Sequence, residues 1–146
     1  MSQPFADLII KGKKTIELRK WNTKFRGEFL IHSPMKIKFQ DCKRLGINEA
    51  NLMTGAIIGK AVIYDVKTYK TKKELQADKK YHFASDEPYR KYGFLLKNAK
   101  EFKIPIPCKG KLGFFDMHLD DTIIKDEDIT SDLFDEEYRT QWINHH

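Results

Sequence analysis

Residues 12–19 have the sequence GKKTIELR, which predicts a change from helix to strand. A short helix with Ser2 as its N-cap is expected before them, because Phe5, Leu8 and Ile9 are spaced to form one apolar face. Gly12 is expected to end this helix, since glycine readily adopts the left-handed conformation that closes a helix. Polar and apolar residues then alternate, which is typical of a strand with one face in the core.

The strand expected at residues 15–21 places Glu17, Arg19 and Trp21 on one face, and Lys14 directly precedes it. A lysine beside a carboxylate and a second cation can be held in position to bind a ligand. It can also transfer a proton or act as a nucleophile if its pKa is lowered. The alternative is a solvated surface ion pair beside a half-buried tryptophan, which contributes little to stability.

Further ligand-binding candidates lie near this strand or in a later aromatic stretch. Trp21 is expected to stack on a base. Asn22 and Thr23 follow in a predicted tight turn, where they either contact a base edge or phosphate or bond to their own backbone. Arg26 is a candidate for holding a phosphate or for stabilising the turn. Tyr92 alternates with basic residues, a pattern that suits base stacking but also a barrel core.

The rest of the chain predicts several short strands and few short helices. We expect strands at residues 27–32 (paired with the preceding strand across a turn), 55–69, 92–106 and 110–117. Within these strands, Gly59 is expected to mark a bulge or close approach, and a break is expected near Asn98. Helices are expected around residues 40–45, 71–79 and 132–143. This pattern predicts an α+β, mainly β protein, a small β-barrel with short flanking helices.

Composition excludes several protein classes. The 146 residues suit one domain, and two cysteines cannot form a disulfide scaffold. The sequence has no apolar run near the roughly 20 residues of a membrane span and no secretory signal pattern, so we expect a cytoplasmic protein without membrane contact. No metal-ligand spacing and no glycine-rich phosphate loop occur, so neither a metal nor a cofactor is expected.

Charge is divided unevenly along the chain. The net charge of +6 combines residues 1–115, with 25 Lys and Arg against 11 Asp and Glu, and residues 116–146, with two basic and ten acidic residues. The first part therefore has a net charge of +14 and the second −8. A basic body indicates a polyanionic partner, nucleic acid first, although a lysine-rich solvated surface gives the same numbers.

The residues quoted above carry a resemblance to a known family. The pattern G-x-K-x-x-E-x-R, formed by Gly12, Lys14, Glu17 and Arg19, resembles the mark of the ASCH family. The segments SQPFA (2–6), YGF (92–94) and KGKLG (109–113) resemble its flanking segments, so the likeness covers about residues 1–117. It implies a PUA-like β-barrel whose cleft binds RNA or a modified nucleobase. Some relatives are amidohydrolases that remove the acetyl group of acetylated cytidine through a lysine, and one is reported as a ribonuclease.

Three functions remain open on the sequence. The first is an RNA- or nucleotide-binding domain whose basic cleft accepts an unpaired or modified base. The second is a hydrolase on a modified nucleoside or RNA, with Lys14 and Glu17 as the catalytic pair. The third is a protein-interaction module that uses the acidic extension, residues 118–146, which follows a domain at residues 1–117. Residues 145–146 resemble the start of a purification tag and are left out of the chemistry.

Overall fold

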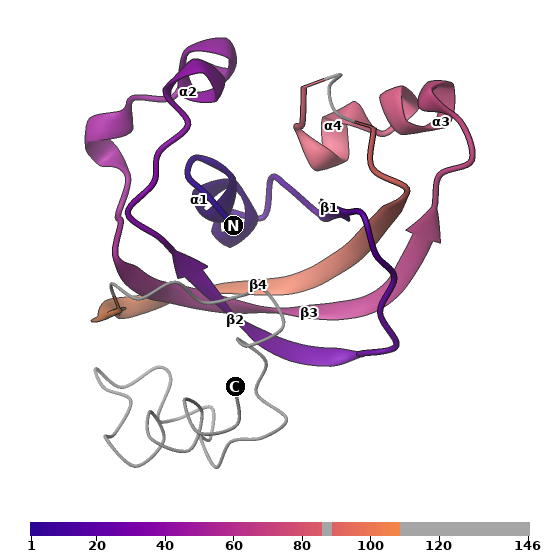
Figure 1. The fold of residues 1–146 in the computed structure, drawn as a ribbon. Helices are drawn as coiled ribbons and strands as arrows, with labels where there is room; N and C mark the ends of the chain where they lie inside the picture. Colours follow the sequence, from indigo (N-terminus) through magenta and orange to yellow (C-terminus); the bar gives the residue numbers. More distant parts are fainter. Residues whose placement is uncertain (86–88, 109–146) are drawn as a thin grey trace.

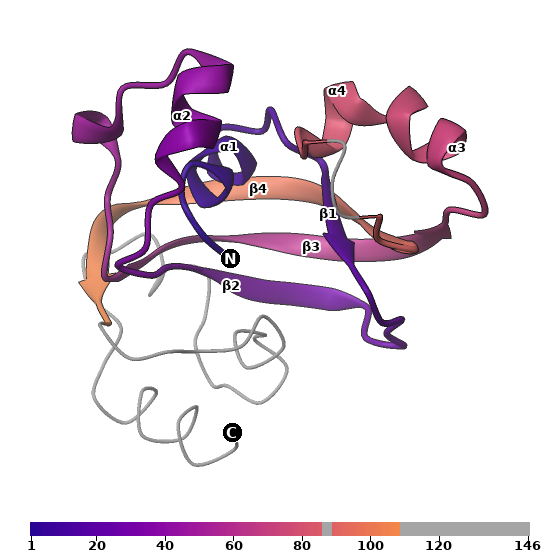
Figure 2. The same cartoon turned by 45° about the horizontal axis from the view of Figure 1, so that its top comes forward.

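The computed structural model describes residues 1–85 and 89–108 (Figure 1). In that part of the chain, four strands form one antiparallel sheet in the order β1-β4-β3-β2, and Figures 1 and 2 show the helices on one side of it. The helices are α1 (Phe5–Ile10), α2 (Phe39–Leu45), the 3-10 helix η1 (Glu49–Asn51), α3 (Lys72–Ala77) and α4 (Lys79–His82). The strands are β1 (Ile16–Arg19), β2 (Gly27–Ser33), β3 (Ala56–Thr68) and β4 (Tyr92–Pro107).

This architecture confirms the α+β, mainly β class, but the four described strands form an open sheet and not the closed barrel that was expected, because β1 and β2 do not pair with each other. The strand expected at residues 110–117 and the helix expected at 132–143 lie outside the described residues, as does the acidic extension. Helix α3 begins as predicted, with the Thr71 hydroxyl accepting a hydrogen bond from the backbone N–H of Glu74 at 3.1 Å. None of the described helices has the length and apolar character needed to cross a membrane.

The main core lies between α1 and the sheet. Ala6 and Ile9 of α1 are fully buried and belong to one apolar cluster with Phe29, Ile63 and Phe94 of three strands. Burying an aliphatic or aromatic side chain of this size contributes about 1.5–3 kcal/mol, so this contact fixes α1 on the sheet. The apolar spacing that predicted α1 is therefore explained by its packing.

Helix α1 ends as predicted but begins differently. Gly12 has φ +76°, the left-handed conformation expected after a helix. At the other end, Pro4 rather than Ser2 precedes the first helical residue, and it makes no side-chain capping bond. The side chain of Gln3 takes this role instead, because its Oε1 accepts a hydrogen bond from the backbone N–H of Asp7 at 2.9 Å.

Two irregularities in the long strands were also expected. A Cβ atom on Gly59 would lie 2.3 Å from the backbone oxygen of Lys100 and 2.4 Å from Cδ1 of Ile10, so only glycine fits this crossing. The pairing register of β3 and β4 shifts between Ile57 and Gly59. Asn98 has φ +54°, which interrupts the regular geometry of β4 where a break was predicted.

The predicted pairing of the first two strands is wrong. Strand β1 pairs with β4, with Ile16 opposite Leu95 and Arg19 opposite Tyr92, whereas β2 pairs with β3. The physical reason is the length of β3 and β4, 13 and 16 residues, which pair with each other and form the centre of the sheet. Each shorter strand then hydrogen-bonds to a free outer edge of this pair. Within the part of the chain that the structure describes, β1 and β2 therefore lie at opposite edges of the sheet.

Candidate functional site

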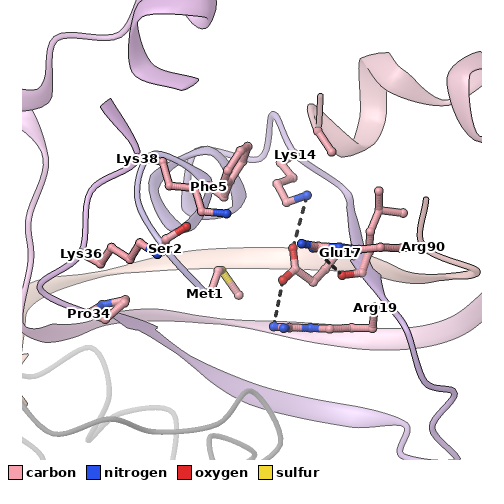
Figure 3. A pocket seen from close by; sticks show the side chains of 12 residues that line it. Met1, Ser2, Phe5, Lys14, Glu17, Arg19, Pro34, Lys36, Lys38 and Arg90 are labelled. Atoms are coloured by element: carbon pink, nitrogen blue, oxygen red, sulfur yellow. Dashed lines mark hydrogen bonds and ion pairs between the residues drawn. The ribbon is translucent and has the colours of Figure 1, made fainter. Parts of the chain in front are cut away.

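A cavity of about 430 Å³ lies beside β1, between α1, the segment leading into α2 and the segment before β4 (Figure 3). Its volume falls in the range of small-molecule sites. In the part of the chain that the structure describes, its lining combines basic and apolar side chains with one carboxylate. The lining residues are Met1, Ser2, Phe5, Lys14, Glu17, Leu18, Arg19, Pro34, Lys36, Lys38, Ala84 and Arg90.

Glu17 is held between two cations at the wall of this cavity. Its Oε1 lies 3.3 Å from Nζ of Lys14, and its Oε2 lies 2.9 Å from Nη2 of Arg19 (Figure 3). Lys14 is 3% exposed and Glu17 is 7% exposed. The cluster is therefore not the solvated surface ion pair that the sequence left open. The spacing of residues 14, 17 and 19 correctly predicted that these side chains meet.

The ammonium group of Lys14 is fixed by three acceptors. Its Nζ donates to the backbone oxygens of Ile16 at 2.7 Å and His82 at 2.6 Å, besides facing Glu17. Three acceptors match the three N–H bonds of an ammonium ion, so the geometry favours the charged form. Burial lowers the pKa of Lys14, while the neighbouring Glu17 carboxylate opposes that shift.

The carboxylate of Glu17 is kept ionised by its neighbours. Burial alone raises the pKa of Glu17, but Lys14 and Arg19 outweigh burial, so the pKa lies below its ordinary value. The negative charge is thus compensated within the cluster. The remaining cations of the lining then make the cavity electropositive.

Three of those cations were missed by the sequence interpretation. Lys36 and Lys38 line the cavity from one side, and Arg90 lines it from the other (Figure 3). Among the described residues, no carboxylate forms an ion pair with any of the three. The sequence contains a signal for each of them. Lys36 and Lys38 alternate with Met35 and Ile37, as on one face of an extended segment. Arg90 lies within the aromatic and basic stretch YRKY, residues 89–92.

Phe5 supplies an aromatic surface in the cavity wall. The Nζ atoms of Lys14 and Lys38 lie 5.5 Å and 5.9 Å from the centre of its ring, within the range of cation–π attraction. The spacing of Phe5 with Leu8 and Ile9 predicted only a core position on the helix. Its ring is placed at the cavity because it lies on the side of α1 that turns away from the sheet.

His82 supports another part of this wall. It is buried, and its Nε2 lies 2.8 Å from the backbone oxygen of Leu75. Its Nδ1 accepts a hydrogen bond from the backbone N–H of Ala84, so Nε2 is the donor toward Leu75. Burial lowers the pKa of His82, which agrees with a neutral ring. This arrangement fixes the backbone next to Ala84, one of the lining residues.

Two aromatic candidates lie outside the cavity lining. Trp21 is 48% exposed, and the guanidinium carbon of Arg19 lies 5.6 Å from the centre of its ring. Trp21 is therefore coupled to the cavity through Arg19. Tyr92 is partly buried against the main core, with Nζ of Lys91 5.7 Å from its ring centre.

The turn residues after β1 also lie outside the lining and bond to the turn itself. The side chain of Asn22 accepts from the backbone N–H of Thr23 at 2.7 Å, and the Thr23 hydroxyl accepts from that of Phe25 at 3.0 Å. Arg26 donates to the backbone oxygens of Thr23 and Phe25, and its Nη2 lies 3.6 Å from Oδ1 of Asp65. The structure thus gives these side chains turn-stabilising contacts, and ligand binding by them stays a prediction.

Comparisons with known proteins give a family match and a similar solved structure. The family model described as "ASCH domain" matches residues 1–106. Among solved structures, the crystal structure of ASCH from Zymomonas mobilis is similar with a TM-score of 0.55 and 15% sequence identity, covering 99% of this chain and 90% of that chain. At this identity the likeness concerns the fold. The search of the curated proteins finds no match.

Proposed function

The chain belongs to the ASCH domain family, and from that premise we propose that its cavity binds an unpaired or modified base of RNA. ASCH domains are generally RNA-binding domains with a PUA-like fold. The observation that carries the proposal is the cavity itself, about 430 Å³ in volume, to which the described residues contribute five basic side chains and a single carboxylate. Unpaired bases are recognised in such pockets by stacking and by hydrogen bonds at their edges, while cations attract the phosphates.

Each wall of the cavity has a role in this proposal. The ring of Phe5 supports the base, and Arg19 contributes charge while holding Glu17 in place. Glu17 keeps free lone pairs after pairing with Lys14 and Arg19, so it accepts hydrogen bonds from a base edge. Trp21 contributes stacking outside the cavity.

The remaining predicted contacts extend this surface. Asn22, Thr23 and Arg26 follow Trp21 in the chain, and Tyr92 pairs with Arg19 across β1 and β4. We propose them as weaker contacts to the RNA that continues beyond the bound base. Their turn and core contacts already satisfy much of their bonding capacity, so single substitutions there are expected to reduce affinity less than changes in the cavity.

Fluorescence anisotropy with a short single-stranded RNA tests the proposal. Arg19→Ala is expected to weaken binding by about tenfold or more, because it removes a charge-assisted contact and releases Glu17. Trp21→Ala is expected to weaken binding by less than that. A matched control is Lys72→Ala/Lys73→Ala on α3, which removes two exposed charges away from the cavity lining. Affinity unchanged in both Arg19→Ala and Trp21→Ala would refute the proposal.

A hydrolase is the second candidate, favoured by the contact between Lys14 and Glu17. Nζ and Oε1 of this buried pair lie 3.3 Å apart, and burial lowers the pKa of Lys14, as a catalytic lysine requires. In this proposal water cleaves the amide bond of acetylated cytidine, releasing acetate and cytidine, with Lys14 as nucleophile or base and Glu17 as its partner. Wild type and Lys14→Ala are compared on acetylated cytidine and on RNA. No turnover of either substrate by the wild type would refute it.

The extent of the domain is a proposal as well. The family match ends at residue 106, and we place the domain boundary at residue 117, with residues 118–146 as an acidic extension. The extension lies outside the described residues. Its composition suits a segment that recruits a basic partner or competes with RNA for the basic domain.

A further inference from the structure

The cavity carries more positive charge than a single base needs. Among the described residues, five cationic side chains line it, and the carboxylate of Glu17 is already matched by Lys14 and Arg19. Lys36, Lys38 and Arg90 remain, and no carboxylate among the described residues forms an ion pair with them. A neutral nucleobase offers these three cations no counter-charge.

The three cations can reach a ligand from opposite sides. Lys36 and Lys38 lie on one side of the cavity, and Arg90 lies near Glu17 on the other (Figure 3). In the described part of the chain, Arg90 donates one hydrogen bond, from Nη1 to the backbone oxygen of Leu18 at 3.4 Å. Most of its five N–H donors therefore remain available for a ligand. Such donors bind phosphate oxygens with charge-assisted hydrogen bonds.

The size of the cavity restricts the ligand to a single nucleotide. A volume of about 430 Å³ suits one nucleotide. Next to it lies a smaller space of about 70 Å³, which shares Phe5, Lys38 and Arg90 with the cavity and is also lined by Asp41. That space is too small for a second nucleotide. A strand therefore places one nucleotide in the cavity, and its other nucleotides lie outside it.

We propose that the cavity takes a nucleotide bearing a terminal phosphomonoester, with the phosphate held by Lys36, Lys38 and Arg90. This rests on the proposed function and specifies its ligand class. A phosphomonoester carries about −1.5 to −2 charges at neutral pH, which three unmatched cations neutralise better than the single charge of an internal phosphodiester. The ligand is either a free nucleoside monophosphate or the phosphorylated end of an RNA strand.

Two sets of paired probes test the phosphate directly. In the first set, one short single-stranded RNA carries a hydroxyl or a phosphate at its 5′ end, and the same two forms are compared at its 3′ end. In the second set, each of the four nucleosides is compared with its monophosphate by calorimetry. A terminal phosphate is expected to strengthen binding by about tenfold in at least one pair. Dissociation constants that do not change with the phosphate in any pair would overturn the inference.

Variants connect the effect to these residues. Lys36→Ala/Lys38→Ala and Arg90→Ala are each expected to remove most of the gain from the terminal phosphate. Their side chains are exposed or half-buried, so both variants should fold, and thermal unfolding checks this. Lys72→Ala/Lys73→Ala is the control and keeps the full gain. A gain that persists in both cavity variants would contradict the assignment of the phosphate to these residues.

The outcome also separates this inference from the proposed function. Hydroxyl-ended RNA could bind as tightly as phosphate-ended RNA and lose affinity in Arg19→Ala. That result would support the proposed function and refute the preference for a phosphorylated RNA end. A wild-type protein that binds neither RNA nor the free monophosphates would refute both. The comparison of RNA ends with free monophosphates shows which source of the phosphomonoester the cavity prefers.

Discussion

Two carboxylates in this molecule are each held by two donors, yet their surroundings differ. Glu17 lies between Lys14 and Arg19 at the wall of the large cavity. Asp78, at the junction of α3 and α4, receives Nζ of Lys67 and the hydroxyl of Tyr69, both at 2.6 Å. Asp78 does not line the cavity, and its contacts tie α3 and α4 to the end of β3.

The difference shows what distinguishes a binding site from a structural clasp, the cluster formed by Asp78, Lys67 and Tyr69. An acid with two donors is present in both places, so ion pairing alone identifies neither. At Glu17 the cluster is almost fully buried and opens onto a space that further cations line. At Asp78 the partner Lys67 is 46% exposed, and the buried Tyr69 completes a local contact. A cavity with unmatched charge, rather than the ion pair, therefore points to a ligand.

The largest expected effect comes from removing the lysine of each cluster. Lys14→Met should lower the free energy of unfolding by about 3–5 kcal/mol, because it leaves Glu17 buried with one cation fewer. Lys67→Met should cost at most about 1 kcal/mol, because water screens its exposed pair. Urea denaturation measures both. Equal losses in the two variants would contradict the distinction between the two clusters.

The same cluster should respond to acid. The pKa of Glu17 is lowered in the folded protein, so its ionised form stabilises the fold above the ordinary value of 4.5. That stabilisation is lost as the pH falls through the lowered pKa. Glu17→Gln should therefore flatten the acid side of the curve of unfolding free energy against pH. A slope as steep as that of the wild type would show that other groups cause the acid dependence.

A smaller effect is expected at the structural clasp. Tyr69→Phe removes one hydrogen bond to Asp78, while Lys67 remains as a partner, so the free energy of unfolding should fall by about 1 kcal/mol. RNA affinity, measured by anisotropy, should stay at the wild-type value. A loss of affinity comparable to that of Arg19→Ala would mean that the clasp takes part in binding.

The smallest expected change comes from removal of the acidic extension. Deleting residues 118–146 removes nine acidic and two basic residues, so RNA affinity should rise by about two- to threefold at low salt through a stronger positive field. Added salt should reduce the difference between the two proteins. An unchanged affinity at low salt would place the role of the extension elsewhere, such as in contact with a protein partner.

Local patterns in the sequence predicted the part of the site whose residues are near one another in the sequence. A helix ended by Gly12 and an alternating strand are enough to bring Lys14, Glu17 and Arg19 together. Their burial was not predicted, because it depends on Phe5 and on the carbonyl of His82, which fold onto the cluster from other elements.

Long-range contacts explain what was missed. Lys36, Lys38 and Arg90 reach the cavity only after the sheet forms, and no local rule connects them with residues 14–19. The pairing of β1 with β2 was predicted from their proximity in the chain, but the longer β3 and β4 determine which edges are free. Asn22, Thr23 and Arg26 had polar side chains suited to a ligand, and the turn itself provides their partners.

The most direct test of the central claim locates the bound RNA. Amide chemical shifts of the isotope-labelled full chain are followed while a short single-stranded RNA is added. RNA bound in the cavity should give the largest changes around Glu17, Arg19, Lys38 and Arg90, with little change around Asp78. Changes centred on α3 or on the exposed lysines of β4, with the cavity residues unmoved, would contradict it.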